Sequence, residues 1–167
     1  MTGPDPLIHF FDAKANAWDG IYTRRKPALL QAWDRLTRQN LKARFEFAVD
    51  RLGDVKGKRV LDVGCGPGHY SVEIASRGAA EVVGLDFSST MLELGRRLAA
   101  HRTVDDRCTF VEGDLFNYVS AVPFDTVVAM GFFDYVSDAV RTLRHLRTMT
   151  EGRVLASFPW RYALRVP

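Results

Sequence analysis

The chain has 167 residues, of which 47% are hydrophobic and 26% charged, a composition typical of a globular protein with its own core. No apolar run approaches the roughly 20 residues of a membrane-spanning helix, and the first residues lack the basic start of a secretion signal, so we expect a cytoplasmic protein outside the membrane. The net charge of +3 is too mild for the broad basic face that binds nucleic acid, and we expect no nucleic-acid partner.

The first 57 residues combine aromatic stretches with helical periodicity. The aromatic residues between Phe10 and Tyr22 either close over a ligand or pack in the core. From Pro27 to Leu52 apolar residues recur at helical spacing. We therefore expect residues 1–57 to form a helical lid and residues 58–167 to form the core that binds the ligand, the two parts making a single domain.

The most informative segment is VLDVGCGPG, which runs from Val60 to Gly68. The apolar run from Arg59 to Val63 predicts a strand buried on both faces. Three glycines, Gly64, Gly66 and Gly68, follow at alternate positions. Because glycine tolerates positive φ and carries no Cβ, the chain can turn tightly here while a ligand packs on the peptide units. The segment therefore predicts a turn that binds a nucleoside or nucleotide.

A helix and a second strand follow this turn. Residues His69 to Arg77 predict a helix that Gly78 ends, and residues Glu81 to Leu85 predict a strand closed by Asp86. In such a βαβ unit, the carboxylate after the second strand lies beside the first glycine turn and can accept the hydroxyl hydrogens of a ribose. Capping of the next helix is the alternative role for Asp86.

The spacing within the turn discriminates between nucleoside ligands. A dinucleotide fingerprint needs G-x-G-x-x-G, but His69 stands where the third glycine should be, and the pattern is G-x-G-x-G. Asp62, just before the turn, would repel a pyrophosphate and attract an ammonium or sulfonium group. The turn therefore favours S-adenosylmethionine over NAD, FAD or ATP.

The rest of the chain continues to alternate. Ser88 or Ser89 is expected to cap a helix that continues to Ala99. Two strands follow, Thr109–Glu112 and Phe124–Met130.

A last helix and a last strand complete the pattern. The helix is predicted to begin at Asp138 and to be broken by Gly152, and a fifth strand is predicted over Arg153–Phe158. The helix face expected to be buried repeats every third residue and comprises Val140, Leu143, Leu146 and Met149.

This order of elements predicts an α/β fold with a Rossmann-like, doubly wound and mostly parallel sheet and helices on both faces. Ligands of such sheets bind beyond the carboxyl ends of the strands. The candidate residues that come just after strands, and should therefore meet in one crevice, are Asp62, Gly64, Asp86, Asp114 and Met130. Cys65, Cys108 and the four histidines show no disulfide or metal-ligand spacing, so we expect no metal site.

Four segments, VLDVGCGPG, VVGLDFSSTML, FVEGDLF and FDTVVAMGFFDYVSD, resemble the ordered motifs of the class I S-adenosylmethionine-dependent methyltransferases. They span most of the chain between Lys58 and Pro159. The glycine turn and the aromatic N-terminal segment are similar to those of the small-molecule enzymes of quinone and tetrapyrrole biosynthesis. The resemblance implies S-adenosylmethionine as cofactor, S-adenosylhomocysteine as product and a small molecule as methyl acceptor.

The resemblance also implies roles for single residues. Asp62 would lie near the amino group of the cofactor, Asp86 would hold its ribose, and Asp114 would meet the amino group of adenine unless it only shapes a turn. Other contacts would come from the turn, the adenine pocket, the fourth strand and the lid, namely Gly64, Cys65, Gly66, Gly68, Phe87, Met91, Leu115, Met130 and Tyr22. Leu115 would offer its backbone N–H to the adenine ring, which Phe87 and Met91 would sandwich.

Methyl transfer is an in-line displacement that mainly requires alignment of two reactants and exclusion of water. Asp134 and Tyr135 are the candidate catalytic residues, in place of a histidine that many members carry there. The methylated atom, O, N or C, stays open. An RNA or protein methyltransferase and a non-catalytic cofactor-binding subunit are the alternative functions.

The family sheet carries two further strands after the fifth, and these C-terminal strands are missing here. The fifth strand would then be an apolar edge, and such edges pair readily with other chains. We therefore expect a truncated sequence, a disordered tail, or coverage of this edge by a second copy or another partner.

Overall fold

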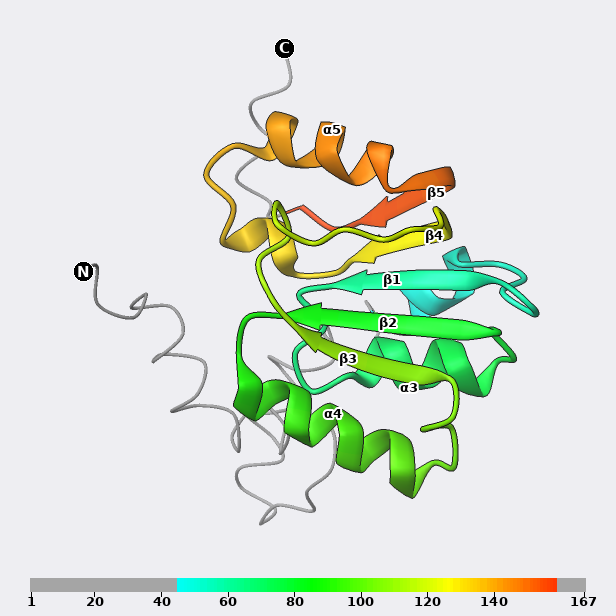
Figure 1. Cartoon of the computed structure of the whole chain (residues 1–167). Helices are drawn as coiled ribbons and strands as arrows, with labels where there is room; N and C mark the ends of the chain where they lie inside the picture. The colour runs from blue at the N-terminus through cyan, green and yellow to red at the C-terminus, as the bar shows by residue number, and fades with distance from the viewer. Residues whose placement is uncertain (1–44, 159–167) are drawn as a thin grey trace, which may run out of the picture.

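A computed structural model describes residues 45–158, which form a parallel sheet of five strands flanked by helices (Figure 1). The strands are β1 (Arg59–Val63), β2 (Glu81–Asp86), β3 (Cys108–Glu112), β4 (Phe124–Ala129) and β5 (Thr150–Ala156). The helices after β1 are α3 (His69–Ser76), α4 (Ser89–His101), the 3-10 turn η1 (Phe132–Asp134) and α5 (Ala139–Thr148). Residues 45–51 are also helical, and most of the predicted lid, including Tyr22, lies outside the described residues.

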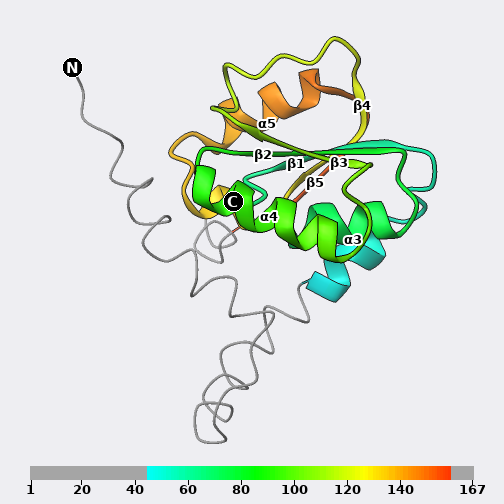
Figure 2. The same ribbon diagram turned by 60° about the horizontal axis from the view of Figure 1, so that its bottom comes forward.

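The strand order is β3-β2-β1-β4-β5, and every pair is parallel. Two crossovers run from β1 to β3 in one direction, and the chain then passes to the other side of β1 to form β4 and β5. Figure 2 shows α3 and α4 on one face of the sheet and α5 on the other. This confirms the doubly wound fold. Its switch point lies between β1 and β4, where such sheets bind ligands.

The sheet is buried on both sides. One core cluster joins it to α3 and α4 and includes Val60 and Ile74, and a second joins it to α5 and includes Leu61 and Leu146. Neighbouring residues of β1 point to opposite faces, so each cluster receives alternate side chains of the same strand. The apolar run of β1 is therefore the shared centre of both cores.

Two helix starts follow from capping residues. The Ser88 hydroxyl accepts the Met91 N–H at 3.3 Å before α4, and the Asp138 carboxylate accepts the Arg141 N–H at 2.9 Å before α5. Each side chain satisfies a backbone donor that the first turn of a helix leaves without a partner. The predicted helix starts are confirmed.

The last two elements differ from the prediction. Helix α5 ends at Thr148 and β5 begins at Thr150, so Gly152 lies inside the strand instead of ending the helix. Gly152 lies opposite Asp125, at an irregularity in the pairing of β4 with β5. Glycine fits there because a Cβ would overlap the Asp125 carbonyl oxygen. The predicted buried face was also wrong at Val140, which is 58% exposed.

None of the described helices combines the length and the apolar character that a membrane crossing requires.

We predict that Gly152→Ala destabilises the protein by about 2 kcal/mol or more, because the added methyl group displaces the β4 backbone at Asp125. Gly113→Ala is the matched control, since its Cβ would meet Leu85 Cδ1 at an ordinary 3.6 Å. Urea unfolding of both variants measures the difference. Equal stability of the two variants would contradict this account of the β5 register.

Candidate functional site

The glycine turn after β1 adopts the conformation that the sequence predicts. Gly64, Gly66 and Gly68 have φ values of +65°, +52° and +75°, all in the left-handed region that side chains disfavour. The turn lies at the carboxyl end of β1, beside β2 and β4. The backbone conformation alone therefore favours glycine at all three positions.

Space around these glycines differs. A Cβ on Gly64 would lie 2.7 Å from Phe132 Cδ2, and a Cβ on Gly68 would lie 2.7 Å from Phe110 Cε1. At Gly66, no described atom lies within 4 Å of the corresponding point. Gly64 and Gly68 are therefore pressed against aromatic rings of the protein itself, whereas Gly66 leaves bare backbone open to a ligand.

The side chain of Cys65 packs in the core of the protein. Its side chain is 7% exposed and belongs to the core cluster on the α3 and α4 side. Burial raises the pKa of its thiol well above the usual value, and nearby Asp62 and Asp86 add to the effect. The thiol is therefore a packing group of that core cluster.

Asp86 ends β2 and connects two segments around the turn. Its Oδ2 accepts the Gly66 N–H at 2.8 Å, and its Oδ1 accepts the Ser88 N–H at 3.0 Å. The cap of α4 is Ser88, so Asp86 is not the capping residue. The Asp86 carboxylate therefore stands at the junction of the two loops, beside the open backbone of Gly66.

Asp62 lies behind the turn, not in the open crevice. Its side chain is 1% exposed, and its Oδ2 accepts the Ser71 hydroxyl of α3 at 2.6 Å. Burial raises the pKa of Asp62 to about 6, the hydrogen bond from Ser71 opposes this shift, and the negative charge of Asp86 adds to it. Direct contact of Asp62 with the amino group of a ligand stays a prediction.

His69 begins α3 directly after the turn. Burial lowers the pKa of its imidazole to about 4, with a further contribution from Arg102. The ring is therefore neutral at pH 7 and places no positive charge against a cationic ligand.

The segment after β3 is brought to the same place. The Gly113 N–H donates to the Asp86 carbonyl at 2.9 Å, which sets Asp114 and Leu115 beside the end of β2. Asp114 Oδ1 accepts the Phe116 N–H at 2.8 Å, so the turn-shaping role considered from the sequence is present. None of the hydrogen bonds of the described residues uses the Leu115 N–H as donor.

The remaining cofactor candidates follow the carboxyl ends of β2 and β4. Met91 lies in the first turn of α4 and is 2% exposed, Phe87 joins β2 to that helix, and Met130 follows β4 and packs partly against the core. Their contacts with a ligand stay predictions. Among the described residues, no group of three or more histidine, cysteine, aspartate or glutamate side chains is placed to hold a metal ion.

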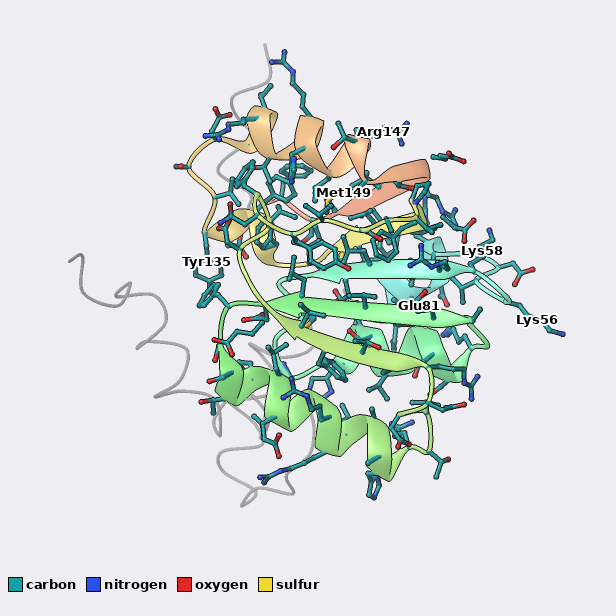
Figure 3. The ribbon with its side chains drawn as sticks, viewed as in Figure 1. Lys56, Lys58, Glu81, Tyr135, Arg147 and Met149 are labelled. Carbon is teal, nitrogen blue, oxygen red and sulfur yellow. The ribbon has the colours of Figure 1, made fainter. Side chains whose placement is uncertain are left out.

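Asp134 and Tyr135 lie at the end of η1, which the contact of Phe132 with Gly64 holds beside the glycine turn. Figure 3 shows Tyr135 beyond the arrowheads of the strands, whereas Glu81 lies toward the opposite, amino-terminal end of the strands. Burial raises the pKa of the Tyr135 phenol, and the charge of Asp134 raises it further. Tyr135 is therefore protonated at neutral pH and is suited to hydrogen bonding instead of removing a proton.

Sequence reasoning missed one residue near the site. The sequence assigned no role to His145, but its Nε2 lies 3.0 Å from the Leu115 carbonyl oxygen. The contact joins residues that are 30 positions apart, so no local sequence pattern predicts it.

Comparisons with known proteins agree with this geometry. A family model described as a methyltransferase domain matches residues 54–162. A ubiquinone biosynthesis O-methyltransferase of Neisseria meningitidis serogroup C is 40% identical over 101 residues, which are 58% of this chain and 41% of that protein. A cycloartenol-C-24-methyltransferase of Arabidopsis thaliana is 30% identical over 125 residues, which are 74% of this chain and 37% of that protein.

Solved structures show the same likeness. An S-adenosylmethionine-dependent methyltransferase from Thiobacillus denitrificans, in complex with S-adenosylhomocysteine, superposes with a TM-score of 0.61 at 26% identity, covering 68% of this chain and 47% of that chain. The chain belongs to the methyltransferase-domain family, and its predicted membership of the class I S-adenosylmethionine-dependent methyltransferases is confirmed. It spans less than half the length of the two curated relatives quoted above.

We predict that Asp62→Asn stabilises the protein at pH 7 and removes a pH dependence. The pKa of Asp62 is raised from 3.8 to about 6, so its contribution to stability is complete below pH 3.8 and is lost as the pH rises to about 6. The loss is on the order of 3 kcal/mol, at about 1.4 kcal/mol per pH unit. Urea unfolding between pH 3.5 and 8 measures it.

The control for Asp62→Asn is Ser71→Ala, which removes the hydroxyl and leaves the buried charge in place. We expect this variant to be less stable than the wild type at pH 7, because it takes away the donor that stabilises the carboxylate. A wild type and an Asp62→Asn variant with parallel pH profiles would contradict the argument.

Proposed function

We propose that this chain is the cofactor-binding core of an S-adenosylmethionine-dependent methyltransferase that acts on a small molecule. The observation that carries the proposal is the Asp86 carboxylate hydrogen-bonded to Gly66, the one glycine of the turn that faces open space. A charged acceptor beside exposed backbone, at the switch point of a doubly wound sheet, is suited to a nucleoside. Family membership then selects S-adenosylmethionine as that nucleoside.

The described residues fit this cofactor. Asp86 supplies acceptors for the ribose, Leu115 supplies an N–H without a protein acceptor in the described residues, and Asp114 supplies a carboxylate for the adenine amino group. Two carboxylates, Asp62 and Asp86, flank the glycine turn, and the neutral His69 does not oppose a sulfonium. This distribution of charge suits a cationic ligand more than a phosphate.

S-adenosylmethionine, when bound, supplies an electrophilic methyl group. The residues of this chain hold the cofactor against the glycine turn and exclude water with the apolar side chains of Phe132 and Met130. Asp134 and Tyr135 are placed beside this turn, so we assign them to the acceptor side. Tyr135 would donate a hydrogen bond to the acceptor, and Asp134 would be the group that receives a proton from a hydroxyl nucleophile.

The acceptor is proposed as a small molecule of open atom type. The two curated relatives are named as an O-methyltransferase and a C-methyltransferase, and both share the cofactor-binding core of this chain. The names of these relatives therefore do not select one atom type for this chain. No observation specifically favours an RNA or protein acceptor or a non-catalytic subunit. A cytoplasmic location and a partner or second copy along the β5 edge stay predictions.

We predict that Asp86→Asn lowers the affinity for S-adenosylhomocysteine by about 10- to 100-fold, the equivalent of one lost hydrogen bond to a charged group. Titration calorimetry on the folded variant measures it. Ser88→Ala is the matched control, because it removes the cap of α4 and keeps the carboxylate. Wild-type affinity in Asp86→Asn, or an equal loss in Ser88→Ala, would overturn the assigned role.

A further prediction separates the acceptor side from the cofactor side. Asp134→Asn and Tyr135→Phe should each bind S-adenosylhomocysteine within about twofold of the wild type, because neither group lies on the strand ends that hold the nucleoside. The same calorimetry decides. A loss of tenfold or more in either variant would place that residue on the cofactor instead.

A further inference from the structure

Helix α5 contacts the segment after β3 through two residues one turn apart. His145 Nε2 lies 3.0 Å from the Leu115 carbonyl oxygen, and its ring lies 4.9 Å from the ring of Phe116, tilted by 30°. The guanidinium of Arg141 lies 4.6 Å from the centre of the same Phe116 ring. Residues four apart share one face of a helix, so one face of α5 holds both the backbone and the side chain of this segment.

In Figure 2 the segment after β3 lies on the same side of the sheet as α5. The two elements are therefore neighbours in space. The segment is also tied to the ligand crevice at its other end. The Gly113 N–H donates to the Asp86 carbonyl at 2.9 Å, two residues before Leu115. The groups held by α5 therefore lie two and three residues after Gly113, whose N–H is bonded to the residue that we assign to the ribose.

A single peptide unit is fixed at both of its polar atoms. The unit between Leu115 and Phe116 gives its carbonyl oxygen to His145 and its N–H to Asp114 Oδ1 at 2.8 Å. Because a peptide unit is planar, these two hydrogen bonds set its orientation. The Phe116 N–H of this unit orients the Asp114 carboxylate. The Leu115 N–H belongs to the preceding peptide unit, whose Asp114 carbonyl accepts the N–H groups of Asn117 at 3.1 Å and Tyr118 at 3.0 Å. Under the proposed function, the Asp114 carboxylate and the Leu115 N–H are the two groups that face adenine.

We propose that His145 is a positioning residue for adenine recognition, acting through the peptide unit between Leu115 and Phe116. The inference rests on the proposed function, since it concerns the adenine edge of that same site. A neutral imidazole with its proton on Nε2 and a protonated imidazolium can both donate to the Leu115 carbonyl.

Adenine selectivity is the property that distinguishes positioning from a general structural role. S-adenosylhomocysteine presents a 6-amino donor and an N1 acceptor to Asp114 and the Leu115 N–H, and S-inosylhomocysteine presents a 6-oxo acceptor and an N1–H donor instead. A correctly oriented edge prefers the adenine compound, because the inosine compound leaves polar groups mismatched. Loss of orientation reduces this preference, whereas a global loss of stability affects both ligands alike.

The test compares His145→Phe, which keeps an aromatic ring and removes the donor, with His145→Gln, which keeps a donor. Calorimetry on the full chain measures the dissociation constants of both nucleosides. We expect His145→Phe to bind S-adenosylhomocysteine about 3- to 10-fold more weakly than the wild type. The ratio of the dissociation constants of S-inosylhomocysteine and S-adenosylhomocysteine should fall by a similar factor. In His145→Gln, the logarithm of this ratio should recover at least half of the decrease seen in His145→Phe.

His101→Phe is the matched control, since His101 is exposed at the end of α4 and should leave both constants unchanged. If His145→Phe fails to fold, His145→Asn replaces it, because the shorter side chain cannot reach the Leu115 carbonyl. Unchanged preference in the folded variant, or equal weakening of both ligands, overturns the positioning role alone. A wild type that binds neither nucleoside overturns the proposed function together with it.

Discussion

The site depends on one carboxylate that accepts two backbone hydrogen bonds. Asp86 receives the Gly66 N–H on one oxygen and the Ser88 N–H on the other, and its own carbonyl receives the Gly113 N–H. The loops that leave β1, β2 and β3 therefore meet at a single residue. Because the strands are parallel and adjacent, this meeting point coincides with the crevice where a doubly wound sheet binds its ligand.

Packing and ligand binding are divided among neighbouring glycines. Phe110 fills the space beside Gly68, and also that beside Gly84 and Gly95, while Phe132 fills the space beside Gly64. The glycine pattern is thus only in part a ligand signature. Most of its members allow aromatic rings to approach the backbone, and this close packing holds the open backbone at Gly66 in place.

The sequence predicted the elements whose signals are local. Continuous apolar runs identified the buried strands to within one or two residues, and Ser88 and Asp138 identified two helix starts, because a cap needs only its own turn. The start of β5 could not be predicted, since it depends on the main chain of Asp125 in another strand. The same limit applies within the site. The positions of the candidate residues followed from topology, but the turn of Asp62 toward Ser71 and the contact of His145 with Leu115 are tertiary.

The most direct test of the account is a crystal structure of the full chain with S-adenosylhomocysteine. We expect the ribose hydroxyls within hydrogen-bond distance of Asp86 and the sulfur beside Gly66, with the adenine at Leu115. Electron density for the nucleoside in another part of the molecule would contradict the account. So would a ribose whose hydroxyls lie beyond hydrogen-bond distance of the Asp86 carboxylate.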